Sequence, residues 1–216
     1  MIEATYIDHM GTDLTVANAA RVSFGKQSEM DTSDVWGPPT LKDKDAKLIS
    51  YLAKYKHISP FGHCFASFHV KAPVFVARQL VKHKFLRWNE ISRRYVDSEP
   101  EFYVPEVWRG RSADKKQGSE GEVKTNANVQ YHNNVMLQLY KQQLDEGVSP
   151  EQARMNLPQS MMTEWYWSGS LDAFVDMCNL RCTDDTQRES RIVADAIDEE
   201  MERLFPVSWS ALRHAS

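Results

Sequence analysis

Cysteine is scarce in this chain, and the three that are present form no framework. A small, odd number of cysteines argues against a disulfide-stabilised secreted domain and for a reducing compartment. Cys178 and Cys182 lie four residues apart, as two metal ligands can. No Cys/His pair completes a ligand set. We therefore interpret Cys178 and Cys182 as two small side chains near a helix end and expect no metal site.

The sequence also lacks any apolar run of membrane-spanning length. Its first ten residues have no basic region followed by an apolar core, so no secretory signal is expected. These two absences predict a cytoplasmic protein with no membrane association.

Positive charge is not in excess, because the formal net charge is −4. This balance argues against a general nucleic-acid-binding protein. Between residues 71 and 94, however, seven basic residues accompany a single carboxylate, that of Glu90. A focused positive site on an acidic chain suits a small anionic ligand. The basic residues are Lys71, Arg78, Lys82, Lys84, Arg87, Arg93 and Arg94.

The 216 residues are enough for one domain with a substantial core, and their periodicities are mixed. Residues 64–71 alternate in polarity, which predicts a strand. Further strands are expected at 1–8, 95–96 and 102–104. Helices are expected at 13–22, 41–55, 73–81, 123–146, 170–180 and 185–205, and Pro206 is expected to end the last of them. Two more helices are expected to begin at residues 149 and 158, and the second of these would contain Trp165 and Trp167. We predict an α+β fold with a small mixed or antiparallel sheet flanked by several long helices.

Residues 109–122 are polar, contain glycine and show no periodicity. We interpret them as a mobile surface insertion within a single domain that spans residues 1–216, since the helix that follows still needs a partner.

The most informative segment is 82–95, which combines cations, one carboxylate, one hydroxyl and aromatic rings. Cations neutralise phosphate, aromatic rings stack on planar ligands, and Asn, Glu and Ser bind hydrogen-bonding edges. This mixture predicts a site for a phosphorylated heteroaromatic ligand.

The same segment resembles the signature of the flavin-dependent thymidylate synthase family, which is Arg-His-Arg, seven residues, then Ser. Lys82-His83-Lys84 occupies the first three places, and Asn89-Glu90, Ser92 and Arg94-Tyr95 follow at the family spacing. Residues 18–24, 57–63, 147–158 and 179–181 resemble other elements of the family. The resemblance therefore covers most of the chain outside the insertion.

The resemblance implies an enzyme that converts dUMP to dTMP, with methylenetetrahydrofolate as one-carbon donor and NADPH-reduced FAD as hydride source. It also implies a homotetramer in which several subunits build each active site. The family uses no cysteine nucleophile.

By resemblance, Arg181 stabilises the uracil anion and Ser92 has a chemical or a positioning role. The implied dUMP contacts are Gln79, Leu80, Lys82, Glu90, Ser92, Arg93, Arg94, Arg154 and Arg181. The implied FAD contacts are His57, Ser59, Lys82, His83, Lys84, Glu90, Ser170 and Asp176.

Each of these residues also has a structural interpretation. Arg181 could cap a helix C-terminus, Glu90 could pair with Arg93 or Arg94, and His83 could be a helix-end histidine. The chain also departs from the family pattern. Lysine replaces both signature arginines, Arg87 stands where a small hydroxyl residue is usual, and Asp172 and Asp176 place carboxylates near the adenine end of the flavin.

Two other functions remain open. One is an inactive relative that binds nucleotide or flavin, which the lysine substitutions favour. The other is a small nucleic-acid-binding protein that uses the basic residues between 71 and 94, which the acidic balance disfavours.

Overall fold

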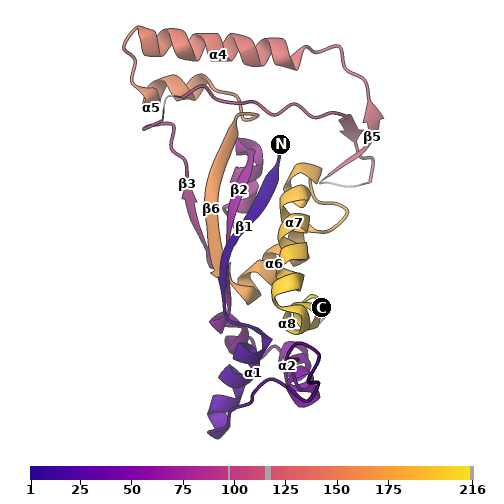
Figure 1. The fold of residues 1–216 in the computed structure, drawn as a ribbon. Coiled ribbons are helices and arrows are strands. Elements are labelled where there is room, and N and C mark those ends of the chain that lie inside the picture. The colour runs from indigo at the N-terminus through magenta and orange to yellow at the C-terminus, as the bar shows by residue number, and fades with distance from the viewer. Residues whose placement is uncertain (97, 115–117, 215–216) are drawn as a thin grey trace.

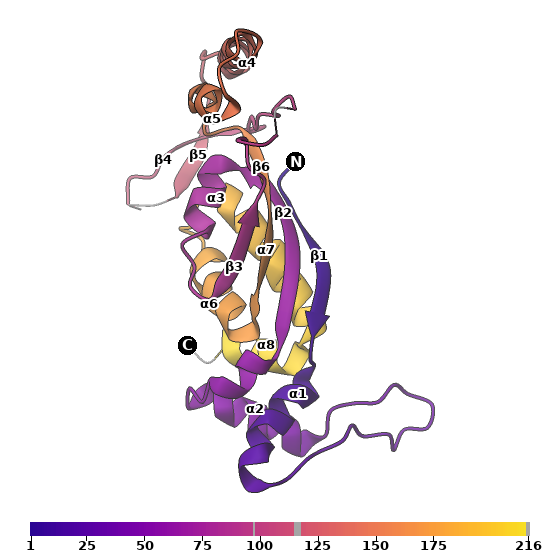
Figure 2. The same cartoon turned by 90° about the vertical axis from the view of Figure 1, so that its left-hand side faces the viewer.

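The computed structural model describes residues 1–96, 98–114 and 118–214, and its centre is a four-stranded sheet. All neighbouring strands are antiparallel, in the order β1 (Glu3–Met10), β2 (Phe65–Pro73), β6 (Met162–Ser170) and β3 (Leu86–Glu90) (Figures 1 and 2). β2 confirms the predicted alternation, since Ala66, Phe68 and Val70 are buried while Phe65 and Ser67 are not.

Helices α6 (Leu171–Arg181) and α7 (Arg188–Leu204) cover one face of the sheet, and α3 (Val74–Leu80) joins β2 to the turn before β3 (Figure 1). The sheet and these helices share one core, which contains Phe68, Trp165, Trp167 and Phe174. Helices at 170–180 and 185–205 were expected, and α6 and α7 confirm them. Leu80, at the end of α3, is also fully buried in this core.

The helix expected from Pro158 is wrong, because Trp165 and Trp167 belong to strand β6. Trp165 and Trp167 are buried and Tyr166 between them is exposed, which is the period of a strand. β2 and β3 pair with the two edges of β6 and satisfy its backbone groups.

At one end of the sheet lie α1 (Asp13–Arg21), α2 (Asp43–Lys54) and α8 (Pro206–Arg213) (Figure 1). The buried Asp13 carboxylate accepts hydrogen bonds from the backbone N–H groups of Val207 and Ser208, at 2.9 and 2.8 Å. It thereby caps α8. The sequence indicated that Pro206 ends a helix. α7 does end at Leu204, but Pro206 also begins α8, since proline suits a first helical turn.

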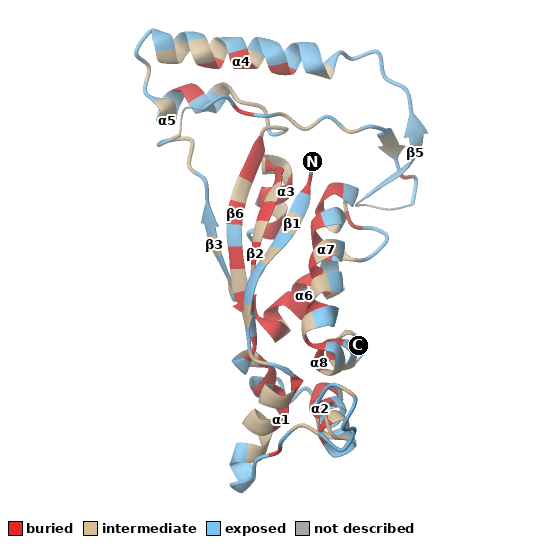
Figure 3. Cartoon of the chain, viewed as in Figure 1, coloured by how far each residue is buried: buried red, intermediate tan, exposed pale blue. Residues whose placement is uncertain are grey.

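At the other end lie α4 (Val129–Asp145), α5 (Pro150–Ala153) and a hairpin of β4 (Trp108–Arg111) and β5 (Ser119–Val123) (Figure 1). α4 is largely exposed, but one of its sides packs Leu137 and Tyr140 against Ala153 of α5 in a small second core (Figure 3). The hairpin occupies the segment expected to be an unstructured insertion, and its mobility stays a prediction.

Two short strands were expected between β3 and β4. Residues 95–96 form no strand, because the backbone N–H groups of Tyr95 and Val96 both donate to Ser92 C=O, at 2.9 and 3.1 Å, and close a turn. Of the segment 102–104, only Phe102 forms a β-bridge, with Met161. The sheet and the surrounding helices confirm the α+β class. Within the described ranges, no helix combines the length and apolar character needed to cross a membrane.

Candidate functional site

Strand β3 separates the predicted ligand-binding residues into two groups. Leu86 at its start pairs with Gly169, and the adjacent Ser170 pairs with Phe65. The turn that holds Lys82, His83 and Lys84 therefore leads into the end of the sheet where α6 begins. Within this turn, His83 contacts Arg181, the last residue of α6. Glu90 ends β3 opposite Trp165, and Ser92, Arg93 and Arg94 follow it at the other end.

In the first group, Arg181 contacts His83 directly. Arg181 Nε donates to His83 Nε2 at 3.0 Å, although the two residues are 98 positions apart. Burial, and then the nearby Arg181 charge, lower the pKa of His83 from 6.5 to about 4. Burial also lowers the pKa of Arg181. His83 is therefore neutral at physiological pH and accepts the hydrogen bond through Nε2.

The side chain of Gln79 is held by α7. Gln79 Nε2 donates to Gln187 Oε1 at 2.7 Å, and Ser190 Oγ donates to Gln79 Oε1 at 2.8 Å. Neither α7 residue was singled out from the sequence. Ser190 could have been, because it is a polar residue on the buried stripe that continues through Val193, Ala194 and Ile197.

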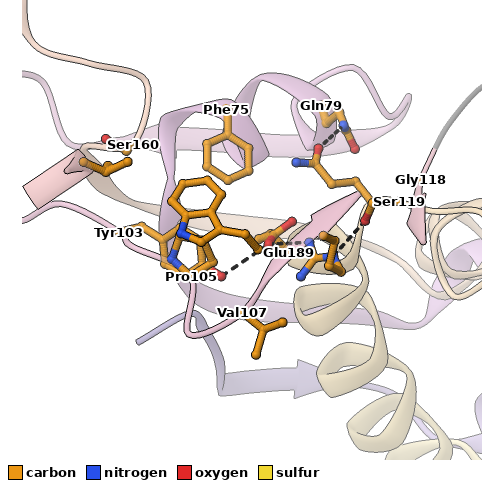
Figure 4. Close-up of a pocket in the computed structure, with 13 residues that line it drawn as sticks. Phe75, Gln79, Tyr103, Pro105, Val107, Gly118, Ser119, Ser160 and Glu189 are labelled. Carbon is orange, nitrogen blue, oxygen red and sulfur yellow. Dashed lines mark hydrogen bonds and ion pairs between the residues drawn. The ribbon is translucent and has the colours of Figure 1, made fainter. Parts of the chain in front are cut away.

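Gln79 also lines a cavity of about 620 Å³ between α3, α7 and the β4–β5 hairpin (Figure 4). Its walls include Phe75, Tyr103 and Trp108. Glu189 is 4% exposed and lies in the centre of the lining in Figure 4. Its Oε1 accepts from Arg109 Nη2 at 2.6 Å and from the Tyr103 hydroxyl at 3.3 Å.

Burial, and then the Glu189 carboxylate, raise the pKa of Tyr103. The sequence did not predict this polar cluster, because Arg109 lay in the expected insertion and Glu189 on an ordinary helix.

In the second group, Glu90 is bound by neighbours in the sheet. Its two carboxylate oxygens accept from Thr163 Oγ1 at 2.7 Å and Trp88 Nε1 at 3.1 Å. Among the described residues, no ion pair joins Glu90 to Arg93 or Arg94, so that structural interpretation is wrong.

Ser92 and Arg94 contact one another. Ser92 Oγ accepts from the backbone N–H of Arg94 at 3.4 Å and from Arg94 Nε at 3.3 Å. Arg93 donates instead to the Ser98 carbonyl. Arg154 lies just after α5, at this same end of the sheet, and its Nε donates to Glu151 C=O at 3.3 Å (Figure 1). Arg94 and Arg154 are both exposed.

The remaining residues predicted to bind flavin lie around the start of α6. His57 and Ser59 are exposed, and Ser170 is the N-cap of α6. Burial, and then the neighbouring Asp172, raise the pKa of Asp176. Asp172 Oδ1 is buried, has no hydrogen-bond partner among the described residues, and would lie 3.9 Å from a Cβ added at Gly62.

Cys178 and Cys182 have a third potential ligand nearby, Asp198, which the sequence did not indicate. The Asp198 carboxylate is already engaged, because Arg213 Nε lies 2.9 Å from Oδ1 and Trp209 Nε1 donates to Oδ1 at 2.9 Å. Burial raises the pKa of Cys178 well above its usual range. Only Cys178 of the three is buried, whereas Cys182 and Asp198 are half-buried.

Comparisons with known proteins agree with the geometry. The model of the family described as thymidylate synthase complementing protein matches residues 5–207. The flavin-dependent thymidylate synthase of Thermus thermophilus is 38% identical over 208 residues, which are 95% of this chain and 73% of that protein. The Treponema denticola enzyme of the same name is 38% identical over 221 residues, with 96% and 78% covered.

Among solved structures, the UMP/dUMP methylase PolB from Streptomyces cacaoi bound with 5-Br dUMP superposes with a TM-score of 0.82. It is 28% identical, with 98% of this chain and 94% of that chain covered. The same enzyme bound with 5-Br UMP gives a TM-score of 0.82 at 27% identity. With its fold, its signature residues and these relatives in agreement, this chain belongs to the flavin-dependent thymidylate synthase family.

Proposed function

We propose that this enzyme methylates dUMP to dTMP, with methylenetetrahydrofolate as one-carbon donor and NADPH as the reductant of bound FAD. The single observation that carries the proposal is the half-buried Arg181 guanidinium, which is held at its Nε and has no carboxylate partner among the described residues. A full positive charge at this point is suited to a uracil anion, whose electron-rich C5 attacks the one-carbon unit.

The dUMP phosphate would be held by Arg94 and Arg154, since guanidinium groups bind phosphate in a bidentate manner. Both are exposed, and the Ser92 hydroxyl fixes the Arg94 side chain. Gln79 and Glu90 would orient the sugar and base.

FAD fits the first group of residues. Lys82 and Lys84 are exposed and available to a diphosphate. Asp172 Oδ1, which has no partner within the described part of the chain, would accept a hydrogen bond from a hydroxyl or amine of the adenosine half. His57, Ser59 and Ser170 lie at the same end of the sheet. When reduced, FAD supplies the hydride that completes the methyl group.

We propose further that a homotetramer assembles the site. Among the described residues, no hydrogen bond or ion pair joins Arg181 or Lys82 to Ser92, Arg94 or Arg154, and the two groups lie at opposite ends of β3. A second copy that brings one group to the other would complete a dUMP site. Light scattering coupled to size-exclusion chromatography tests this assembly.

The function is tested by mass spectrometry of the products after incubation with FAD, NADPH, methylenetetrahydrofolate and dUMP. We expect dTMP, and none when FAD is omitted. Arg181→Ala should abolish the product. Arg203→Ala, which removes an exposed arginine paired with Glu200, is the matched control and should retain it. A parallel reaction with UMP tests the second nucleotide named for PolB.

Bound flavin without dTMP would favour the inactive relative. Neither flavin binding nor product, with salt-sensitive nucleic-acid binding, would favour the nucleic-acid-binding protein.

A further inference from the structure

Arg181 is held by a neutral imidazole, whereas five other arginines among the described residues contact carboxylates. Its Nε donates to His83 Nε2 at 3.0 Å, and no hydrogen bond or ion pair of Nη1 or Nη2 is found within the described residues. The arginines that contact carboxylates are Arg21, Arg109, Arg191, Arg203 and Arg213.

The hydrogen bond determines the state of the imidazole. Arg181 can only donate, so His83 Nε2 must be an unprotonated acceptor and the ring proton must lie on Nδ1. A protonated ring would bring two positive charges together at this distance. Burial, which lowers the pKa of His83 to about 4, maintains the neutral form.

The imidazole is itself fixed by its surroundings. It lies at the turn after α3, where His83 N–H donates to Leu80 C=O at 3.1 Å, and Leu80 is fully buried. Its ring centroid is 6.4 Å from that of the buried Trp167, in an edge-on arrangement. The acceptor therefore has a defined position.

We propose that His83 is a positioning residue, whose neutral imidazole directs the Arg181 guanidinium at the pyrimidine ring of the bound nucleotide without neutralising its charge. A carboxylate in this place would hold the guanidinium equally well but would cancel much of the field that stabilises a uracil anion. The inference rests on the proposed function, because it requires a pyrimidine nucleotide at Arg181.

The arrangement also exceeds what a helix-end arginine requires. Arg181 is the last residue of α6, where a positive charge is favourable wherever the side chain points. Such a role does not need an acceptor on Nε from a turn 98 residues away. The specific contact, rather than the charge alone, is what the proposal uses.

The test is an ultraviolet titration of 5-bromo-dUMP bound to the FAD-loaded enzyme, because loss of the N3 proton changes the absorption of the pyrimidine. In the wild type we expect the N3 pKa of the bound nucleotide to be at least about one unit below that of the free nucleotide. His83→Phe keeps an aromatic ring beside Trp167 but removes the acceptor, and should abolish this shift. His83→Gln restores a neutral acceptor and should recover at least half of it.

Turnover supplies a second measurement. For His83→Phe we expect kcat to fall about 100-fold, as for a misplaced catalytic group, with a smaller than threefold change in KM for dUMP. His214→Phe, the same substitution at an exposed histidine near the C-terminal end, is the matched control and should leave both measurements unchanged.

The outcomes separate this inference from the proposed function. If the wild type binds no 5-bromo-dUMP, the proposed function fails and this inference fails with it. If the wild type binds it with the N3 shift and folded His83→Phe shows the same shift, only the role of His83 is overturned. If His83→Phe does not fold, His83→Gln decides, since equal loss of the shift in a folded glutamine variant contradicts rescue by an acceptor.

Discussion

Arg109 of β4 and Glu189 of α7 form an ion pair across 80 residues of sequence, with Arg109 Nη2 2.6 Å from Glu189 Oε1. Arg109 Nε also donates to Ser119 Oγ of β5 at 2.7 Å. One guanidinium thus joins both strands of the hairpin to the helix that holds Gln79. The ion pair therefore connects the β4–β5 side of the cavity to its α7 side.

The ion pair predicts an asymmetric effect of mutation. Arg109→Met leaves the buried Glu189 carboxylate without its charge partner and should lower the free energy of unfolding by about 2–3 kcal/mol. Glu189→Gln leaves a partly exposed guanidinium and should cost about 1 kcal/mol. Urea denaturation measures both, with Arg203→Met, at an exposed pair, as a control that should cost less than about 0.5 kcal/mol. Equal losses for Arg109→Met and Arg203→Met would show that burial adds nothing.

Gly169 of β6 lies opposite Leu86 of β3, where the two paired strands come close together. A Cβ added there would overlap Leu86 Cδ2 and lie 3.1 Å from the Phe85 carbonyl oxygen. Gly169→Ala should therefore separate β3 from β6 and cost about 1–3 kcal/mol of stability, as overpacked cores do. Gly62→Ala is the matched control for thermal unfolding, since its nearest neighbour would be 3.9 Å away. A stability of Gly169→Ala equal to that of Gly62→Ala would contradict the close packing.

The elements that could be predicted from the sequence are those whose burial is one-sided. β2 alternates because only one face meets the helices, and α7 has a continuous buried stripe. β6 was not found, because its buried Trp165 and Trp167 alternate with exposed Tyr166, and three consecutive aromatic residues show no alternation in the sequence. Pro158 then suggested a helix start. The β4–β5 hairpin was missed because its anchor, Glu189, is distant in sequence.

The candidate site was predicted in its residues but not in its contacts. The signature included His83, and the separate resemblance of residues 179–181 indicated Arg181. Nothing local indicated that the two residues touch across 98 positions. The polar residues that hold Gln79 were missed for the same reason. These contacts arise from how α3 and the turn after it pack against α6 and α7, which the spacing of one segment does not encode.

Ser92 is expected to act through Arg94. Its hydroxyl oxygen accepts from Arg94 Nε, so Ser92→Ala should release the guanidinium proposed to bind the dUMP phosphate. We predict a rise of about 5–20-fold in KM for dUMP, with kcat within about threefold, since one hydrogen bond to a charged group is lost. Ser98→Ala is a control, because Ser98 contacts Arg93 through its backbone carbonyl. A loss of kcat with unchanged dUMP affinity would instead assign Ser92 a chemical role.

The half-buried, neutral His83 should make stability depend on pH. Because its pKa falls from 6.5 to about 4 on folding, the unfolded chain binds the proton more readily. The contribution is complete above about pH 6.5 and is lost as the pH falls toward 4. Its size should be on the order of 1–2 kcal/mol, since the ring is half-exposed and retains part of its hydration.

Urea denaturation from pH 7 to 4 should show this loss of stability in the wild type and not in His83→Gln. Arg181→Gln, which removes the charge, should reduce it, and an identical pH dependence in all three proteins would contradict the assignment.

The lysines of the signature predict weak retention of FAD. Lys82 and Lys84 are exposed and keep the charge of the family's arginines, but an ammonium group makes neither bidentate contacts with a diphosphate nor planar stacking on a ring. The double variant Lys82→Arg, Lys84→Arg should lower the dissociation constant for FAD by about tenfold, as expected for one or two added charge-assisted bonds. Fluorescence titration of the flavin measures this. Lys141→Arg is the control and should have no effect, because Lys141 lies on α4 and pairs with Glu99. An unchanged FAD affinity in the double variant would show that the lysines bind the diphosphate as well as arginines do, or do not meet it.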